Sequence, residues 1–424
     1  MAVERSVGVE VFSPPQGAGE EKYVSHLNRR QALRLFAAAG VAGAAAPLLS
    51  ACSDNSSSTS NTAPPPGPPV KLGMIVPLTG SRKDLGNEMD NGFQLYLKLH
   101  DNKLGNREVQ LLKVDEGETP DIGKAAAEKL TKEDRVLALT GVASAATMMA
   151  IRDTVEAAAV PLVGSNASPT ALQGANYIWR TSFVANEPGQ ALGKWAADNA
   201  GGPLAIVASD YPGDDDEVAG FRDAFVSANG TIAGNAIKWT PFQQKDFSQV
   251  FQQVKNSGAA SMFAFYAGAS AIDFVKQFKA AKFPGSFKLI APGSLTEGYV
   301  LKQQGADAKD IYTAMNYSPD LDNAANRRFI ADYQKAYGTI PSTYAMASYD
   351  AAAVLDKAIG DASRSLDSFS LNAAIGKLGQ IDSPRGGWQF SQNRTPLQRW
   401  YLRQVRMDGA LLSNVLTAEL TTLG

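Results

Sequence analysis

Short apolar runs alternate with segments of helical periodicity along the N-terminal half of the chain, and this alternation restricts the fold more than any other sequence feature. A parallel pair of strands needs a crossover of a dozen or more residues, usually a helix that packs back on the sheet. The repeated strand–helix order therefore predicts a parallel sheet with helices on both faces. The expected strands are 70–77, 109–114, 136–140 and 161–164, and the expected helices are 84–101, 120–133 and 144–159.

A second run of the same pattern follows. Its expected helices are 187–200, 214–229, 247–256 and 270–282, and its expected strands are 204–209, 232–239, 261–266 and 288–292. Residues 177–181, between the runs, are predicted to form the strand that crosses from one lobe to the other. Later helices at 323–337, 344–362 and 371–378 would cover the existing sheets. The end of the chain, at 387–390 and 399–405, alternates like a hairpin that closes at Asp408-Gly409.

These elements predict an α/β fold with two doubly wound Rossmann-like lobes joined by several hinge crossovers. With 424 residues the chain is long enough for two such lobes. The first lobe is expected to comprise residues 70–185 plus 317–378, and the second lobe residues 186–316 plus 379–424. Two α/β lobes with a cleft between them form the architecture of a hinged ligand trap.

Residues 1–51 are predicted to be an export signal with a lipobox, because a basic segment with paired arginines precedes an apolar run too short to span a membrane. The run ends in Leu49-Ser50-Ala51-Cys52, which resembles a bacterial lipobox, so Cys52 is expected to be the lipidated first residue of the mature chain. The paired arginines also resemble a twin-arginine signal, but their neighbours depart from it, which leaves the export route open. Residues 52–69, rich in Ser and then Pro, are predicted to form a disordered tether.

Composition and missing motifs exclude several classes of function. A formal net charge of −2 gives no general attraction to nucleic acid or to an anionic membrane. Cys52 is the single cysteine, so no intramolecular disulfide can form, and two histidines are too few for a Cys/His metal site. Phosphate-binding loops, dinucleotide-binding turns and nucleophile elbows have no matching motif in the sequence. We therefore expect no enzyme activity, no cofactor and no metal.

Residues 139–147 are predicted to contain the end of a buried strand, a glycine turn at Gly141 and the first turn of a helix. A helix N-terminus presents free backbone N–H groups and the positive end of the helix dipole, so this junction can bind an anion. Small side chains from Ala143 to Ala146 would let a ligand approach the backbone closely. The alternative is an ordinary strand-to-helix turn of an α/β core, which this stretch by itself favours.

Several motifs taken together resemble the type I periplasmic binding proteins, the leucine/isoleucine/valine-binding-like receptors of ABC importers. They cover roughly residues 70–405 in the family's order: Gly73–Gly80, Asn91-Gly92, Asp115-Glu116 with Thr119-Pro120, Gly141–Ser144, Ser165–Pro169, Arg180-Thr181, Asp210-Tyr211, Gly268-Ala269 and Ala345–Leu355. The resemblance implies a substrate-binding lipoprotein that closes on a small solute and delivers it to the permease subunits of an ABC importer. It implies an exported protein, lipid-anchored to the outer face of the cytoplasmic membrane (periplasmic or cell-surface). We expect this protein to be a monomer and to bind no nucleic acid.

The resemblance also assigns ligand-binding residues. In this family, the helix start after the third strand and the loop after the fourth strand hold the ligand's carboxylate. The matching positions are Ser144, Ala145, Ser165 and Ala167, with Thr147 nearby. Aromatic side chains stack on the ligand in the family, and Tyr211, Tyr266 and Tyr317 match that use, although core or rim packing is the alternative for each. Leu85 occupies a position where relatives frequently carry an aromatic residue in the cleft.

The class of ligand depends on the charge opposite the carboxylate. Amino-acid-binding members supply acidic residues to the ligand's ammonium group, but 183–186 and 291–294 here carry no acid in register, although Glu187 and Glu297 lie close in sequence. Burying an ammonium group without a counter-charge costs several kcal/mol. The acidic run 214–217 is interpreted as the solvated first turn of a helix. An aromatic or related organic acid is therefore preferred to a branched-chain amino acid.

Two other classes of function remain open at this point. A sensory binding lipoprotein would use the same trap to signal through a membrane partner, and nothing in the sequence separates it from an import receptor. An exported enzyme is the third hypothesis, and the lack of a histidine or nucleophile arrangement counts against it.

Overall fold

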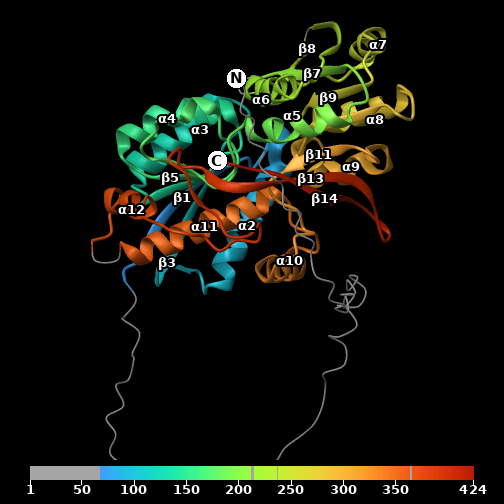
Figure 1. Ribbon diagram of the computed structural model, residues 1–424. Helices are drawn as coiled ribbons and strands as arrows, with labels where there is room; N and C mark the ends of the chain where they lie inside the picture. Colours follow the sequence, from blue (N-terminus) through green and yellow to red (C-terminus); the bar gives the residue numbers. More distant parts are fainter. Residues whose placement is uncertain (1–66, 212–213, 236, 363–364) are drawn as a thin grey trace, which may run out of the picture. The chain divides into compact units, whose positions relative to one another are not determined.

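The computed structural model describes residues 67–424 except 212–213, 236 and 363–364. The predicted export signal, Cys52 and all but the last three residues of the predicted tether lie outside the described residues. Two sheets flanked by helices confirm the predicted α/β class (Figure 1). Among the helices of this described part, none combines the length and the apolar character that crossing a membrane requires.

The first sheet has six strands in the order β2-β3-β1-β4-β5-β6, and all neighbouring pairs are parallel except β2 with β3. The strands are β1 (Val70–Val76), β2 (Lys103–Leu104), β3 (Arg107–Asp115), β4 (Ala138–Gly141), β5 (Leu162–Gly164) and β6 (Ile178–Arg180). The helices between them are α2 (Lys83–Leu99), α3 (Pro120–Glu128), extended by a π-helical turn (Lys129–Glu133), and α4 (Ala145–Ala158). The strands β1, β4 and β5 are buried almost throughout, as expected for a sheet covered on both faces.

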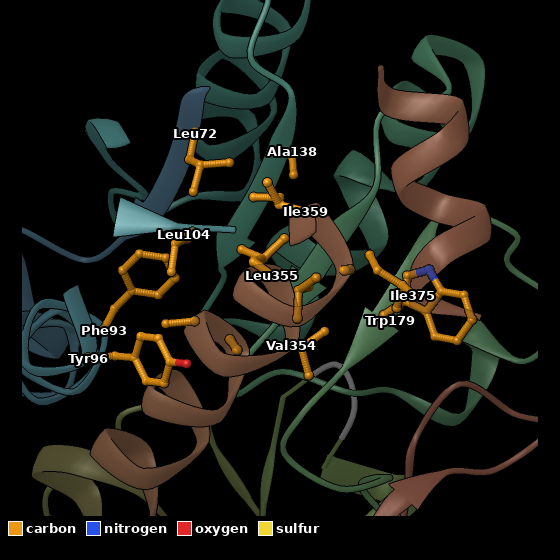
Figure 2. Packing of buried hydrophobic residues seen from close by; sticks show 14 of the residues in the cluster. Leu72, Phe93, Tyr96, Leu104, Ala138, Trp179, Val354, Leu355, Ile359 and Ile375 are labelled. Atoms are coloured by element: carbon orange, nitrogen blue, oxygen red, sulfur yellow. The ribbon is translucent and has the colours of Figure 1, made fainter. Parts of the chain in front are cut away.

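Helices from late in the chain complete the core of the first lobe. The helix α11 (Thr343–Asp361) packs against α2, and α12 (Ser368–Ile375) packs against α11. Leu355 and Ile359 of α11 belong to one buried cluster with Leu72 of β1, and Figure 2 shows these side chains together. Ile381 and Trp388, which the predicted boundaries assign to the second lobe, are buried in the same cluster.

The second sheet follows the order β12-β13-β11-β10-β9-β7-β8, with β14 paired to β13. Its strands are β7 (Leu204–Asp210), β8 (Lys238–Pro241), β9 (Ser261–Phe265), β10 (Lys288–Pro292), β11 (Tyr312–Met315), β12 (Gln389–Phe390), β13 (Pro396–Asp408) and β14 (Leu411–Leu423). The helices of this region are α5 (Glu187–Asn199), α6 (Asp214–Ser227), α7 (Ser248–Asn256), α8 (Gly268–Ala280) and α9 (Tyr299–Gln304). The helix α10 (Ala324–Tyr337) packs against α2 of the first lobe.

The structure departs from the predicted elements at several places, of which three bear on the second sheet. The strand expected at 232–239 begins only at Lys238, because Ala233–Asn235 form a 3-10 turn in which Gly234 has a φ of +69°. The strand β11 was not predicted, since its four residues are too few for a periodicity. The predicted closure at Asp408-Gly409 is confirmed, but the hairpin is β13 with β14, and β12 pairs at the far end of β13.

The parallel strands of the two sheets are arranged in the same order. In the order β3-β1-β4-β5-β6 and in the order β8-β7-β9-β10-β11, the first strand lies between the second and the third. Connections therefore leave the first and third strands in opposite directions, and a crevice opens at their carboxyl ends, where ligands of doubly wound folds bind. In this chain these ends belong to β1 and β4 in the first lobe and to β7 and β9 in the second.

A buried polar network ties the segments that connect the lobes. The carbonyl of Ser182, after β6, accepts hydrogen bonds from Asn316 Nδ2, Arg385 Nη1 and Gln398 Nε2. Arg385 also forms an ion pair of 2.7 Å with Asp350 of α11, and both side chains are almost completely buried. The crossovers after β6, after β11 and before β13 thus meet in one buried hydrogen-bonded network.

Candidate functional site

A cavity of about 420 Å³ is lined by residues of both lobes. Its wall includes the segments that follow the four strand ends at the two crevices. These are Arg82 and Leu85 after β1, Ser144 and Ala145 after β4, Tyr211 after β7, and Ala267 and Gly268 after β9. The position agrees with the expectation that both strand orders create.

Five of the nine predicted ligand-binding residues line this cavity: Leu85, Ser144, Ala145, Ala167 and Tyr211. Ser144 Oγ lies 2.8 Å from the hydroxyl of Tyr211, so this hydrogen bond joins the first lobe to the second. The ring of Tyr211 stacks on Phe242 with centroids 4.4 Å apart and an interplanar angle of 29°. Ser144 also caps α4, because its side chain accepts from the backbone N–H of Thr147.

The other four predicted residues lie outside the lining. Thr147 is fully buried in α4, where its methyl group faces Gly123 of α3. Ser165 Oγ is 2.7 Å from Ser348 Oγ, because the side chain is directed at α11. Tyr266 packs between Phe247 and Phe274, and Tyr317 packs near Phe329 with its hydroxyl on Asn326. Both tyrosines follow strand ends, as predicted, but their rings belong to the cores.

The anion site predicted at the start of α4 is partly filled by the protein itself. The backbone N–H groups of Ala143 and Ser144 donate to the carboxylate of Glu116 at 2.7 and 2.8 Å. Burial raises the pKa of Glu116, and these two donors oppose that shift. The expectation that these N–H groups are free is therefore wrong. The N–H of Ala145, in the first turn of α4, is one that the helix itself leaves without a partner.

The turn between β4 and α4 departs from ordinary backbone geometry. Gly141 has a φ of +99°, and a Cβ there would lie 2.2 Å from the carbonyl oxygen of Ile75. Val142 follows with a φ of +65°, a left-handed conformation that a β-branched residue rarely adopts. Its N–H donates to the same carbonyl at 2.7 Å, which holds the turn against the end of β1. Such strain occurs preferentially at functional sites.

The cavity wall is rich in aromatic side chains that the sequence did not single out as ligand contacts: Phe183, Phe242, Phe265, Tyr299 and Tyr344. Phe265 is the last residue of β9 and Phe242 follows β8, so the end-of-strand rule applied to the second lobe would have found both. Burial, with the nearby charge of Glu88, raises the pKa of Tyr299 to about 12. Its hydroxyl therefore stays protonated and is able to donate a hydrogen bond.

The acidic start of α6 is only in part the solvated turn that the sequence predicted, since Asp215 is exposed but Glu217 is buried. Asp216 accepts two hydrogen bonds from Thr170 of the first lobe, from the backbone N–H at 2.8 Å and from Oγ1 at 2.6 Å. Glu217 is buried and lines the cavity, as does Asp273 of α8. Neither Glu297 nor Glu187 lines the cavity. Glu297 pairs with Arg403, and Glu187 accepts a hydrogen bond from the N–H of Val184.

A third contact joins the lobes. Glu88 of α2 accepts a hydrogen bond of 3.0 Å from the N–H of Tyr299, the first residue of α9. Burial and the nearby carboxylate of Glu297 raise the pKa of Glu88 to about 7. With the bonds Ser144–Tyr211 and Thr170–Asp216, this contact holds the two lobes against each other around the cavity.

Known proteins match this chain over most of its length. A family model described as "Periplasmic binding protein" matches residues 69–410. A protein of Brucella melitensis named Leu/Ile/Val-binding protein homolog 6 is 30% identical over 347 residues, which cover 79% of this chain and 87% of the relative.

Solved structures agree with the family. An ABC transporter solute-binding protein from Rhodopseudomonas palustris BisB5, in complex with 3,4-dihydroxybenzoic acid, superposes with a TM-score of 0.79 at 29% identity over 84% of this chain and 98% of that one. A leucine-binding protein from Thermotoga maritima, 20% identical, shares the fold with a TM-score of 0.75 over 83% of this chain and 98% of that one. The chain belongs to the type I periplasmic binding proteins of the leucine/isoleucine/valine-binding class.

Proposed function

We propose that this protein is the substrate-binding lipoprotein of an ABC importer and that it traps an aromatic or related carboxylic acid between its lobes. The observation that carries the proposal is the cavity at the crevices of both sheets, with an aromatic wall and a mostly apolar surface. Aromatic rings favour stacked or edge-on contact with one another, so such a wall suits a flat aromatic ligand. The likeness to the dihydroxybenzoate-binding neighbour supports the same class.

A branched-chain amino acid is the second candidate, and one observation favours it. Glu217 is buried in the cavity wall, where a carboxylate would balance the ammonium group of an amino acid. The same carboxylate would accept hydrogen bonds from the hydroxyl groups of a hydroxylated aromatic acid.

Binding to the purified protein tests the proposal. Isothermal titration with 3,4-dihydroxybenzoate, benzoate and leucine should give binding of at least one aromatic acid and weaker or no binding of leucine. At 100 times its dissociation constant, the ligand should stabilise the fold by about 2.7 kcal/mol, which a thermal-shift measurement detects. Binding of leucine without either acid would overturn the aromatic preference, and the Glu217→Gln variant should then lose affinity for leucine.

Anchoring and delivery need separate tests. We propose that Cys52 carries the lipid, since it follows the lipobox-like motif Leu49-Ser50-Ala51. The Cys52→Ser variant should move from the membrane fraction to the soluble extracellular or periplasmic fraction. Loss of uptake of the bound acid when this chain is deleted would support import, whereas a lost transcriptional response with unchanged uptake would favour the sensory alternative.

A further inference from the structure

The cavity wall of the first lobe contains a cation, Arg82, for which the described residues supply no ion-pair partner. Arg82 ends the 3-10 turn Gly80–Arg82 and is half-buried. Its Nη2 donates to the carbonyl of Gly117 at 3.2 Å, and its Nε is buried without a partner. A guanidinium has five N–H donors, and none of the carboxylates in the described residues lies within ion-pair distance of it.

The backbone that carries Arg82 is fixed before any ligand enters. Leu78 N and Thr79 Oγ1 donate to the carboxylate of Asp115, and Ser81 donates to Glu118 through both its N–H and its hydroxyl. These bonds attach the turn after β1 to the turn after β3. The backbone of Arg82 is therefore preorganised, and the bond from Nη2 to Gly117 restricts its side chain, so binding of an anion costs less conformational entropy.

The buried carboxylate of Glu116 makes a cation favourable at this place for a ligand that is itself an anion. Its carboxylate occupies the N–H groups of Ala143 and Ser144, so a ligand's carboxylate that enters beside the start of α4 meets a buried acid of the same charge. The charge of Arg82 already acts on Glu116, where it opposes the effect of burial on the pKa. Lys245, the other basic residue of the lining, is exposed.

We propose that Arg82 pairs with the carboxylate of the bound acid and determines the preference for the acid over its neutral analogue. This inference rests on the proposed function, because it needs a carboxylic acid as ligand. The planar guanidinium can donate two parallel hydrogen bonds to a carboxylate, which a lysine cannot do.

The test compares one acid with its amide. Isothermal titration of the purified protein uses 3,4-dihydroxybenzoate and 3,4-dihydroxybenzamide on the wild type, on Arg82→Gln, on Arg82→Lys and on Lys83→Gln. Lys83 is the matched control, since it is the next residue, carries the same charge, is exposed and does not line the cavity. Arg82→Gln should weaken binding of the acid at least tenfold and change binding of the amide less than threefold. Arg82→Lys should lie between Arg82→Gln and the wild type, and Lys83→Gln should match the wild type.

The outcomes separate this inference from the function on which it rests. If the wild type binds the acid and Arg82→Gln binds it equally well, the role of Arg82 is overturned and the proposed function stands. Equal losses for acid and amide would mean that Arg82 supports only the shape of the wall, which also overturns the inference. If the wild type binds neither this acid nor benzoate, the proposed function fails and the inference fails with it.

Discussion

The two hydrogen bonds between Asp216 and Thr170 join the lobes at the edge of the cavity, and they can be weakened without disturbing either core. Asp216→Asn keeps the shape of the side chain but replaces one acceptor oxygen with an NH₂ donor. That NH₂ would face either the N–H or the hydroxyl of Thr170, so at least one bond to a charged acceptor is lost.

The magnitude follows from the geometry. A hydrogen bond to a charged group contributes about 1.5–3 kcal/mol net, and the lower end applies because both residues are half-buried. A ligand that binds the closed arrangement loses affinity by the free energy that closure loses. A loss of about 1.5 kcal/mol in binding free energy corresponds to a roughly tenfold larger dissociation constant.

Isothermal titration with an acid that the wild type binds measures this change, and Asp215→Asn is the control. Asp215 lies in the same first turn of α6 and is exposed, so its substitution removes the same charge from the helix N-terminus without a contact to Thr170. The double variant Asp216→Asn/Thr170→Val should lose less binding free energy than the sum of the losses in the two single variants, because both substitutions remove the same contact. Dissociation constants of Asp216→Asn and Asp215→Asn within twofold of each other would refute the role of this contact in closure.

Three further perturbations test other contacts. Tyr211→Phe loses the bond to Ser144 but keeps the stacking on Phe242, so binding measured by titration should weaken about two- to tenfold, from a net 0.5–1.5 kcal/mol; unchanged affinity would contradict this. Arg385→Met leaves Asp350 buried and uncompensated, so urea unfolding should show a loss of about 3–5 kcal/mol, against no more than about 0.5 kcal/mol for the exposed control Arg327→Met. Glu187 has its pKa raised to about 7 by burial, so between about pH 4.5 and 7 the folded state holds a proton that the unfolded state releases, and stability falls as the pH rises. Glu187→Gln should therefore unfold at higher urea than the wild type at pH 8 but not at pH 5, and equal shifts at both values would reject the titration of Glu187.

The fold was predictable because its signal is local. Most helices and parallel strands lie within a few residues of the apolar patterns, and the repeated strand–helix order leads directly to two doubly wound lobes. The exceptions have local causes as well: Gly234 interrupts the expected strand before β8, and β11 has only four residues. The strand β14 was missed because its alternation is weak and both faces remain largely half-buried or exposed.

The site was predictable only where position along a strand decides the outcome. Ser144 and Tyr211 follow strand ends and do reach the cavity, but Tyr266 also follows a strand end and its ring is buried among phenylalanines. The direction of a side chain at such an end depends on the backbone of the turn, which periodicity does not encode. The occupation of the α4 N-terminus by Glu116 depends on a contact between residues 27 and 28 positions apart, and no local pattern reveals it.

The packing of α11 against the first sheet also determines when this lobe is able to fold. Leu355 and Ile359 cover Leu72, almost three hundred residues away in the chain, and Trp388 closes the same cluster. Before α11 is made, α2 is the helix that covers this face of the first sheet, through side chains such as Phe93, and the area that α11 covers stays exposed until the last fifth of the chain is being synthesised. Contacts of such long sequence separation slow folding, because loop closure must precede the gain from burial. A chain that ends before α11 would expose this apolar area and would be prone to aggregate.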